Sequence, residues 1–593
     1  DDGVKTLDNF EETFGEKPIA TITIEADDAG LVIEDESAQT KGTTKYIIRS
    51  VGKIGDLSRT VSSIIEVAHG ITKETESNYH PAFNYALYSG GNSVMAIPSG
   101  STIDGSVYGH NVKFNASGTK INGSIISERS VELSDNMLIQ GNIYAMDGFV
   151  KILSDQTKVF GDIHSMDDVL LSSGTTLEGS IYTNGGITLN SSNSKVNGDI
   201  NAVEDVVLGS GATIDGNIYT HGSITLNSSN AKVTGDIHAV GNILLGSGAE
   251  VGNIFTKGDI SFNWGIIING DINASGYVGD SSSGGNVEVY GDIYSGSNVT
   301  TQNYQTFKFH RHVNAAGNVE NGNGNNILGD VISGKHVINR GEIHGTIIEN
   351  GNPVEPILPT SPIQELIAPQ FGAYKAIENP KLNKELLEHQ PSTIKSIIST
   401  NTLKLSPGNY GIIEFDTNQG GVIMLESGGG DYFFNSITGG NQKKTMRLDF
   451  SKGGNINIFI KNNLKWNGKI EISMDGINWL DLKNLSEEDQ KKLAERVYCE
   501  THGSFDINEG GDKYWLGTIL SKGDISVASN PYIVGAFVTH SNINFNNSGG
   551  TIIYASENIS NGGSGGSGNV NEKGKNSISS EYRITTSSPI REK

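Results

Sequence analysis

Aspartates recur along the middle of this chain at a fixed place, one residue after a regularly spaced glycine: Asp162, Asp199, Asp236 and Asp271. Paired carboxylates cleave glycosidic bonds, and inverting enzymes hold theirs about 6.5–9.5 Å apart. If each glycine opens one coil of stacked strands, aspartates two coils apart lie roughly 9.6 Å from each other, at or just beyond the upper end of that range. A catalytic site is a single irregularity, however, and these aspartates are the regular feature. Because they alternate with neutral residues, which separates like charges, we interpret them as structural and assign no catalytic residue.

Aromatic residues form a second row, three residues after every second glycine. On stacked strands their rings would project outward about 9.6 Å apart, close to the length of a disaccharide. Two interpretations stay open: a flat row that stacks on a linear polysaccharide, or a ladder packed beneath a covering loop. The candidate carbohydrate-binding residues are Tyr144, Tyr182, Tyr219, Phe255 and Tyr294 in this row, with Trp264, Tyr277 and Tyr290 on neighbouring positions.

Other chemistry is sparse in the sequence. The histidines lack the spacing of a metal site, and His310 and His312 would share one side of a strand without a third ligand in view. Cys499 is the single cysteine, which excludes a disulfide framework and favours a small apolar filler. There is no phosphate-binding loop and no nucleophile elbow. We therefore expect neither a metal nor a cofactor.

The glycines themselves predict the fold, because they recur at steps of 17 to 21 residues from Gly105 to Gly291. Such a period is typical of stacked coils. The coil that begins at Gly179 has three short strand-like pieces separated by turns, with Ile181, Ile187, Leu189 and Val196 facing inward. Residues 179–215 and 216–250 have nearly identical sequences, so the true repeating unit is two coils. The sequence predicts an all-β protein built on a parallel β-helix of ~18-residue coils.

The remaining sequence is divided by changes in this pattern. Residues 1–80 alternate apolar and polar side chains and predict a small β-rich region, and residues 81–350 form the β-helix. Prolines recur from Pro353 to Pro369 and indicate that the chain leaves the coils there, because proline ends strand pairing. Residues 351–510 are expected to be a large β-rich insertion with short helices, one of them capped by Ser486. The coils resume over 511–556, and 557–593 are expected to be a disordered tail.

The charge limits the partners. Acidic residues exceed basic ones, 67 to 43, and the formal charge of −24 argues against nucleic acid and anionic membranes while leaving neutral polymers and cations open. The chain begins at Asp1 without an apolar run, so we expect any signal or anchoring segment to have been removed.

The phrase YIIRSVGKIGDLSRTVSSIIEV and the FNYALYSGGNSV of Phe83 to Val94, followed by the glycine-spaced coils, resemble the extracytoplasmic part of type IV pilus-associated proteins. With the acidic composition and the long region after the coils, the chain resembles the tāpirins, surface proteins of plant-biomass-degrading thermophiles. The resemblance spans most of residues 17–555, but its glycine phrases are shared with bactofilin-like polymers. It implies a non-catalytic, extracellular, cell-surface binder of crystalline cellulose with a β-helix core partly covered by a long loop, and type IV pilus components as partners.

The expected function is therefore attachment to insoluble plant polysaccharide, most of all cellulose, through exposed aromatic side chains and without bond cleavage. One alternative is a structural polymer, since the open ends of a β-helix can stack on another molecule. A second is a β-helix polysaccharide lyase or hydrolase, whose carboxylates would come from the aspartate row or from Asp431, Asp449 and Asp475.

Overall fold

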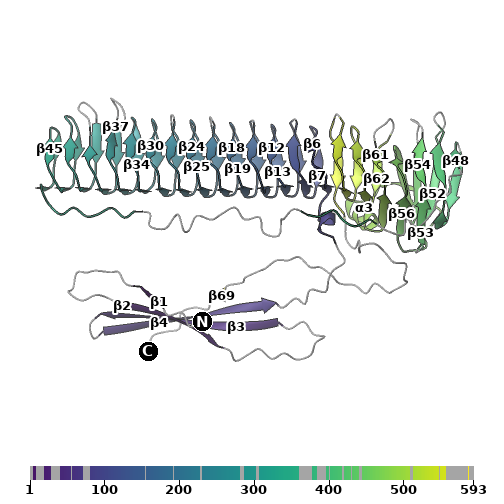
Figure 1. The fold of residues 1–593 in the computed structure, drawn as a ribbon, viewed down its shortest axis with the longest axis horizontal. Coiled ribbons are helices and arrows are strands. Elements are labelled where there is room, and N and C mark those ends of the chain that lie inside the picture. Colours follow the sequence, from purple (N-terminus) through teal and green to yellow (C-terminus); the bar gives the residue numbers. More distant parts are fainter. Residues whose placement is uncertain are drawn as a thin grey trace. The chain divides into compact units, whose positions relative to one another are not determined.

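The computed structural model contains two compact units, residues 1–78 with 564–593 and residues 79–563 (Figure 1). It describes the backbone of residues 5–7, 19–27, 41–54, 57–70 and 585–586, and residues 80–358, 377–382 and 395–555. Gaps in these last ranges fall at 116, 154, 191–192, 228–229, 281–285, 302–305, 400, 417–419, 429, 440–443, 508–511 and 547.

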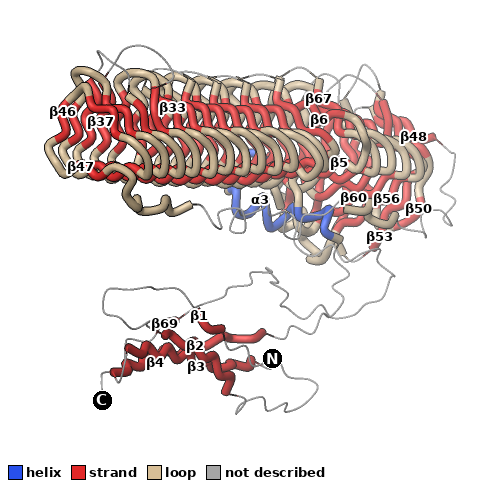
Figure 2. The backbone as a smooth tube through the Cα atoms, turned by 60° about the vertical axis from the view of Figure 1, so that its left-hand side comes forward, coloured by secondary structure: helices blue, strands red, loops and turns tan. Residues whose placement is uncertain are grey.

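The larger unit is a parallel β-solenoid of about 21 coils, which confirms the predicted fold class (Figure 2). The coil opened by Gly179 contains β20 (Ile181–Thr183), β21 (Ile187–Leu189) and β22 (Lys195–Val196), close to the three predicted pieces. Its four predicted inward residues are fully buried. Burying an aliphatic side chain is worth roughly 1.5–3 kcal/mol, so a stack of such coils is stabilised by one continuous core.

Each coil adds one strand to each of three parallel sheets. Sheet B runs from β5 (Leu87–Ser89) and β8 (Val107–Gly109) to β47 (Ile347–Ile348). Sheet C runs from β6 (Val94–Ile97) to β45 (Val337–Asn339), and sheet D from β7 (Thr102–Asp104) to β46 (Glu342–Ile343). Equivalent residues pair directly between coils, as Ile181 does with Ile200. Every side-chain position therefore becomes a column that runs along the rod.

The recurring glycines lie at the corner before sheet B, where successive coils approach closely. A Cβ atom at Gly198 would come within 2.4 Å of the carbonyl oxygen of Gly179, and one at Gly216 within 2.3 Å of that of Gly198. Neither glycine has a positive φ. The glycine column is thus required by the close contact of neighbouring coils rather than by an unusual backbone conformation.

The coils of residues 395–555 belong to the same solenoid, which corrects the expected insertion at 351–510. The chain leaves the far coil after β47, and the coils of residues 395–555 stack toward its first coil. There β66 (Phe537–Thr539) pairs with β5, and β68 (Thr551–Ile553) pairs with β7. The glycine phrase did not reveal the coils of residues 395–510 because their strands are longer and their steps larger, as between Thr445 and its partner Lys469.

This second half has two sheets of its own beside its share of sheets B and D. Sheet E runs from β48 (Lys395–Ile398) to β67 (Ile543–Phe545), and sheet F from β49 (Thr402–Leu405) through β58 (Gly468–Ser473) to β59 (Leu480–Asp481). Helix α3 (Glu487–Ala494) has Ser486 as its N-cap, as predicted, and follows the 3₁₀ turn η2 (Leu482–Asn484). A further 3₁₀ turn, η1 (Pro81–Asn84), precedes β5.

The smaller unit is an antiparallel sheet in the order β1 (Lys5–Leu7), β2 (Ile19–Asp27), β3 (Lys41–Ile54), β4 (Leu57–Gly70) and β69 (Thr585–Thr586). The alternating pattern predicted strands here. Of the expected disordered tail, only Thr585 and Thr586 are described, and they pair with β4. The rest of that prediction lies outside the described residues.

Candidate binding faces

The predicted aromatic row lies on the outer face of sheet B, at the middle residue of each strand. Four of its five rings stack on a histidine of an intervening coil, and Tyr294 lies between Asn273 and Asn314. The ring centroids of Tyr144 and His164 are 5.0 Å apart and those of His164 and Tyr182 4.9 Å, with interplanar angles of 9° and 16°. Tyr219, His238 and Phe255 form an equivalent stack at 4.9 and 4.8 Å. In these two stacks the ring faces are therefore used within the row, and the rings turn their edges outward.

The members of this row, here called the sheet B row, come from successive strands. They are carried by β14 (Ile143–Ala145), β17 (Ile163–Ser165), β20, β23 (Ile200–Ala202), β26 (Ile218–Thr220), β29 (Ile237–Ala239), β32 (Ile254–Thr256), β35 (Ile272–Ala274), β38 (Ile293–Ser295) and β41 (Val313–Ala315). Tyr144 is buried, whereas Tyr182, Tyr219, Phe255 and Tyr294 are partly buried. A flat platform of outward ring faces, the first of the two expectations, is not what this geometry provides.

The second expectation, a covering loop, fits the described ends of the return segment, residues 351–394. The backbone N–H of Val354 donates to Asn314 Oδ1 at 3.3 Å, and that of Ile357 donates to Asn273 Oδ1 at 2.8 Å. A cavity of about 260 Å³ lies between Pro353–Leu358 and the coil corners at Ser275, Ser295 and Ala316.

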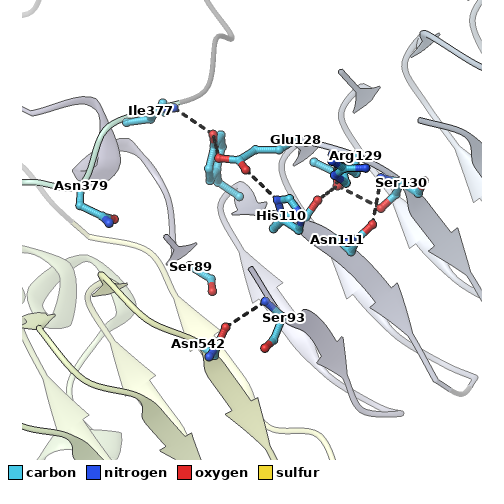
Figure 3. Close-up of polar contacts among 12 residues, drawn as sticks. Ser89, Ser93, His110, Asn111, Glu128, Arg129, Ser130, Ile377, Asn379 and Asn542 are labelled. Carbon is cyan, nitrogen blue, oxygen red and sulfur yellow. Dashed lines mark hydrogen bonds and ion pairs between the residues drawn. The ribbon is translucent and has the colours of Figure 1, made fainter. Parts of the chain in front are cut away.

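At the first coil the return segment is held by a polar cluster (Figure 3). Tyr88 Oη donates to the carbonyl of Ile377 at 2.7 Å, and the N–H of Ile377 donates to Tyr108 Oη at 3.0 Å. Tyr108 in turn donates to Glu128 Oε1 at 2.8 Å, and the other oxygen of Glu128 lies 2.9 Å from His110 Nδ1. Burial, reinforced by the Glu128 charge, raises the pKa of Tyr108, so the phenol stays a donor.

The three other candidate aromatics are not part of the sheet B row. Trp264 is 57 % exposed and lies between the strands of sheets C and D. Tyr290 is 43 % exposed, donates to Glu288 at 2.8 Å and stacks on His310 at 4.3 Å. Tyr277 extends over sheet C, where its hydroxyl occupies the space that a side chain at Gly279 would need. The candidates therefore lie on more than one face of the rod.

The aspartate row is a hydrogen-bonding ladder. Asp162 Oδ1 accepts the N–H of Ser180 at 2.8 Å, Asp199 that of Asn217 at 2.7 Å and Asp236 that of Asn253 at 3.2 Å. Neutral members continue the ladder, since Asn217 Oδ1 accepts the N–H of Asp236 at 2.8 Å. Each side chain thus satisfies a backbone donor of the next coil at a corner.

The carboxylates of the second half also have local structural partners. Asp431 accepts from Asn457 at 2.9 Å, and Asp449 is buried and accepts the N–H of Ser451 at 2.9 Å. Hydrogen bonds from the backbone N–H groups of Asn478 and Ile477 lower the pKa of Asp475. Within the described ranges, no group of three or more His, Cys, Asp or Glu could hold a metal ion.

One acid–base cluster was not anticipated from the sequence. Glu500 accepts from Tyr498 Oη at 2.9 Å and lies 2.8 Å from His502 Nε2, all three on strand β60 (Val497–Thr501) or just after it. The carboxylate is buried, and burial strongly raises the pKa of Tyr498. Tyr498 and His502 are partly exposed, so only the carboxylate of the cluster is fully buried.

The outer face of sheet C contains a column of uncharged side chains. The strands concerned are β18 (Val169–Leu171), β21, β24 (Val206–Leu208), β27 (Ile224–Leu226), β30 (Ile243–Leu245), β33 (Ile260–Phe262), β36 (Val278–Asp280) and β39 (Val299–Thr300). In each of them the second residue, which points outward, is uncharged. We call this column the neutral strip: Leu170, Thr188, Val207, Thr225, Leu244, Ser261, Gly279 and Thr300. Charged residues resume on either side, at Lys151 and Glu320.

The sequence contains the signal for this strip, but at a different place in the repeat. It is the middle residue of the second strand of each coil, and it stands out only after the strands are aligned. On sheet D the corresponding outward positions include Lys158, Lys195, Lys232 and Glu250, and Lys232 pairs with Glu250 at 3.0 Å. The neutral strip is therefore a property of one face and not of the whole rod.

Comparison with known proteins assigns no function to these faces. No protein-family model matches the chain, and no curated protein or solved structure matches it either. Among the described residues no helix is both long and apolar enough to cross a membrane.

Proposed function

We propose that this protein is a non-catalytic adhesin that attaches to an insoluble neutral polysaccharide, with crystalline cellulose as the first candidate. The observation that carries the proposal is the neutral strip, a column of eight uncharged outward residues on successive coils of a chain whose formal charge is −24. At about 4.8 Å per coil the strip is roughly 34 Å long, which matches an extended, regular polymer surface better than a small molecule.

The side chains of the strip suit the two kinds of surface that a sugar polymer offers. The hydroxyls of Thr188, Thr225 and Thr300 can exchange hydrogen bonds with sugar hydroxyls, and Val207 and Leu244 lie between them as apolar contacts for C–H groups. Tyr277 contributes an aromatic ring over the same face, with its hydroxyl directed to Thr300 and Asp280. Aromatic contact thus remains part of the proposal, but through Tyr277 and the exposed Trp264 rather than the stacked sheet B row.

The setting of this activity is proposed from the resemblance to the tāpirins. It includes an extracellular position on a cell surface and association with type IV pilus components. The excess of negative charge supports a neutral rather than an anionic ligand and disfavours nucleic acid as a partner.

A pull-down with microcrystalline cellulose, xylan and chitin tests the proposal, with released reducing sugar assayed in the same tubes. Retention on cellulose without sugar release is expected. Thr225→Glu places a charge in the neutral strip and should abolish retention. Thr213→Glu places the same charge on sheet D and should not. Sugar release would favour the enzyme instead, and equal retention of both variants would exclude the strip as the contact.

A structural polymer is the second candidate, and one observation favours it. In the coil of β45 to β47 the inward residue Ile347 is 44 % exposed, whereas its equivalent one coil earlier, Val331, is fully buried. Val337 and Ile343 of the same coil are also partly exposed. The core cross-section is thus open at this end of the rod, and a second copy could close it by edge pairing.

Sedimentation of the intact chain over a wide concentration range tests this candidate. Assembly through the open end predicts a mass that rises with concentration and returns to one chain in Ile347→Lys. A single-chain mass at every concentration would count against the polymer and leave the adhesin proposal unaffected.

A further inference from the structure

A lysine is buried in the core of the second half of the solenoid. Lys444, the first residue of β55 (Lys444–Asp449), is 1 % exposed, and Asn467 is 5 % exposed. The two are 23 positions apart in the sequence, and Lys444 Nζ donates to Asn467 Oδ1 at 2.5 Å. This contact is shorter than the about 2.7–2.9 Å of a charge-assisted hydrogen bond. Lysine is rarely buried to this extent, so its place beside an equally buried amide requires an explanation.

The two residues lie on successive coils that approach closely at a glycine. Strand β55 pairs in parallel with β58, and the Cα partner of Lys444 is Gly468, the residue after Asn467. A Cβ atom at Gly468 would come within 2.5 Å of the Lys444 carbonyl oxygen. A larger residue at this position would therefore push the coils apart and withdraw Asn467 from the amine.

Aromatic rings lie beside the pair. Lys444 Nζ lies 5.3 Å from the centroid of the Phe415 ring, and Phe415 packs edge-to-face on Trp466 with their centroids 5.9 Å apart. Both aromatic residues are fully buried. Surroundings of low polarity favour the neutral form of an amine, and the neutral form is the nucleophile.

The amine lies within reach of the amide carbon. Asn467 Cγ is one C=O bond, about 1.23 Å, from Oδ1, so it lies no more than about 3.7 Å from Lys444 Nζ. Reacting atoms in a near-attack geometry are about 3–3.5 Å apart. The fold thus holds the two groups together and supplies the proximity that a reaction between separate molecules lacks.

We propose that Lys444 and Asn467 form an intramolecular isopeptide bond, a covalent cross-link between two coils. The lone pair of Nζ attacks Cγ, and the bond from Cγ to Nδ2 breaks. One Nζ proton passes to the leaving nitrogen, so the products are the Lys444–Asn467 amide and ammonia, and no oxidant enters the balance. Because the new amide is neutral, the reaction also removes the free-energy cost of burying an ammonium group.

The cross-link lies near one end of the described second half. Among the described residues sheet F begins with β49 and continues through β52 (Val422–Glu426) to β55 and β58, and Ile397 of the outermost described coil is 62 % exposed. The stability of a repeat protein depends on contacts between neighbours, so a terminal coil is the least supported. A bond between the coils of β55 and β58 prevents opening from this end from reaching the rest of the rod. This role is independent of the proposed adhesion.

Peptide mapping of the intact chain by mass spectrometry tests the proposal. The chain should be lighter than its sequence by the mass of one ammonia, and digestion should yield a branched peptide that contains both Lys444 and Asn467. Ammonia loss without this peptide would assign the reaction to ring closure between Asn467 and Gly468 and overturn the proposal. A linear Lys444 peptide of unmodified mass would overturn it as well.

Variants separate the cross-link from simple packing. Lys444→Met removes the amine and Asn467→Ala removes the amide, so each should have the full mass of its sequence and a lower midpoint of thermal unfolding. Lys404→Arg is the matched control, because Lys404 lies on the same sheet with an exposed side chain, and it should retain the branched peptide. A mass deficit that persists in Lys444→Met would contradict the assignment. If the variants fold poorly, the digest of the parent chain decides alone.

Discussion

At the scale of single residues, position within a column decides what a side chain does. Tyr219 looked like a binding residue because its ring projects outward, but His238 occupies one of its faces. Asp199 looked like a possible catalytic carboxylate, but its oxygen accepts the N–H of Asn217. In a parallel stack the nearest neighbour of any residue is its equivalent on the next coil, so repeated side chains interact first with each other.

Tyr219→Ala is therefore expected to lower the midpoint of thermal unfolding and to leave retention on cellulose unchanged. The loss should be about 1–3 kcal/mol, because a stacked ring and its buried area are both removed. Tyr219→Phe keeps the stack and serves as the control. Loss of retention without loss of stability would return the sheet B row to the role first expected of it.

The histidines of the stacks predict a pH dependence. Burial lowers the pKa of His164 below its ordinary 6.5, against a smaller opposing effect of the Asp162 charge. Its unfolded form thus binds a proton more readily than its folded form, so its contribution to stability is intact above about pH 6.5 and declines as the pH falls below that value. His80 and His540 have pKa values lowered mainly by burial as well.

Unfolding midpoints measured between about pH 7.5 and 5 should fall toward the acid end. His164→Phe retains a ring between Tyr144 and Tyr182 without the titrating group, so its midpoint should fall less than that of the parent chain. Identical slopes for the two proteins would show that protonation of His164 is not linked to folding.

At the scale of elements, corners determine how coils stack. In residues 80–358 the strands of sheets B, C and D are only two to four residues long and could not be stable alone. Their spacing depends on corners where Gly179 and Gly198 lie in direct backbone contact and where acceptors such as Asp199 satisfy the next coil. A substitution at a corner should therefore destabilise two neighbouring coils at once.

Gly198→Ala is expected to destabilise the rod by about 1–3 kcal/mol, because the new methyl would overlap the backbone of Gly179. Gly408→Ala is the matched control, since the nearest atom to a Cβ there is 3.8 Å away and no positive φ is involved. Thermal unfolding and limited proteolysis report both. Equal stability of the two variants would contradict the steric role of the glycine column.

At the scale of the larger unit, the solenoid is built from both ends of its chain segment. Its first coil lies inside the rod, with β8 on one side and β66 on the other. At this junction, the N–H of Ser93 donates to Asn542 Oδ1 at 3.1 Å, and Lys491 of α3 pairs with Asp104 at 2.7 Å. The two halves therefore stabilise each other although no covalent bond joins them there.

Two fragments, residues 79–370 and 371–563, should consequently associate when produced together. The edges of β5 and β7 would otherwise be exposed, and unpaired edges promote aggregation. Copurification of the fragments in equal amounts is the expected result, and Phe537→Pro, which breaks the pairing of β66 with β5, should reduce it. Stable, soluble and non-interacting fragments would show that the junction contributes little.

The sequence by itself determined the coil, since the glycine spacing, the inward residues of Gly179–Val196 and the two-coil repeat are local features that recur unchanged. It also indicated the N-cap at Ser486. Residues 395–510 were misassigned because their coils are longer and lack the glycine phrase, so they are recognisable only through their pairing with neighbouring coils.

The tertiary structure decided which side chains lie next to one another on successive coils. Whether Tyr182 presents a face or an edge depends on the coils above and below it, and the neutral strip is a row only once Thr188, Val207 and Thr225 are aligned. Residues about 18 apart in sequence are adjacent in space. The spacing of residue types along the chain does not by itself show which of them are in contact.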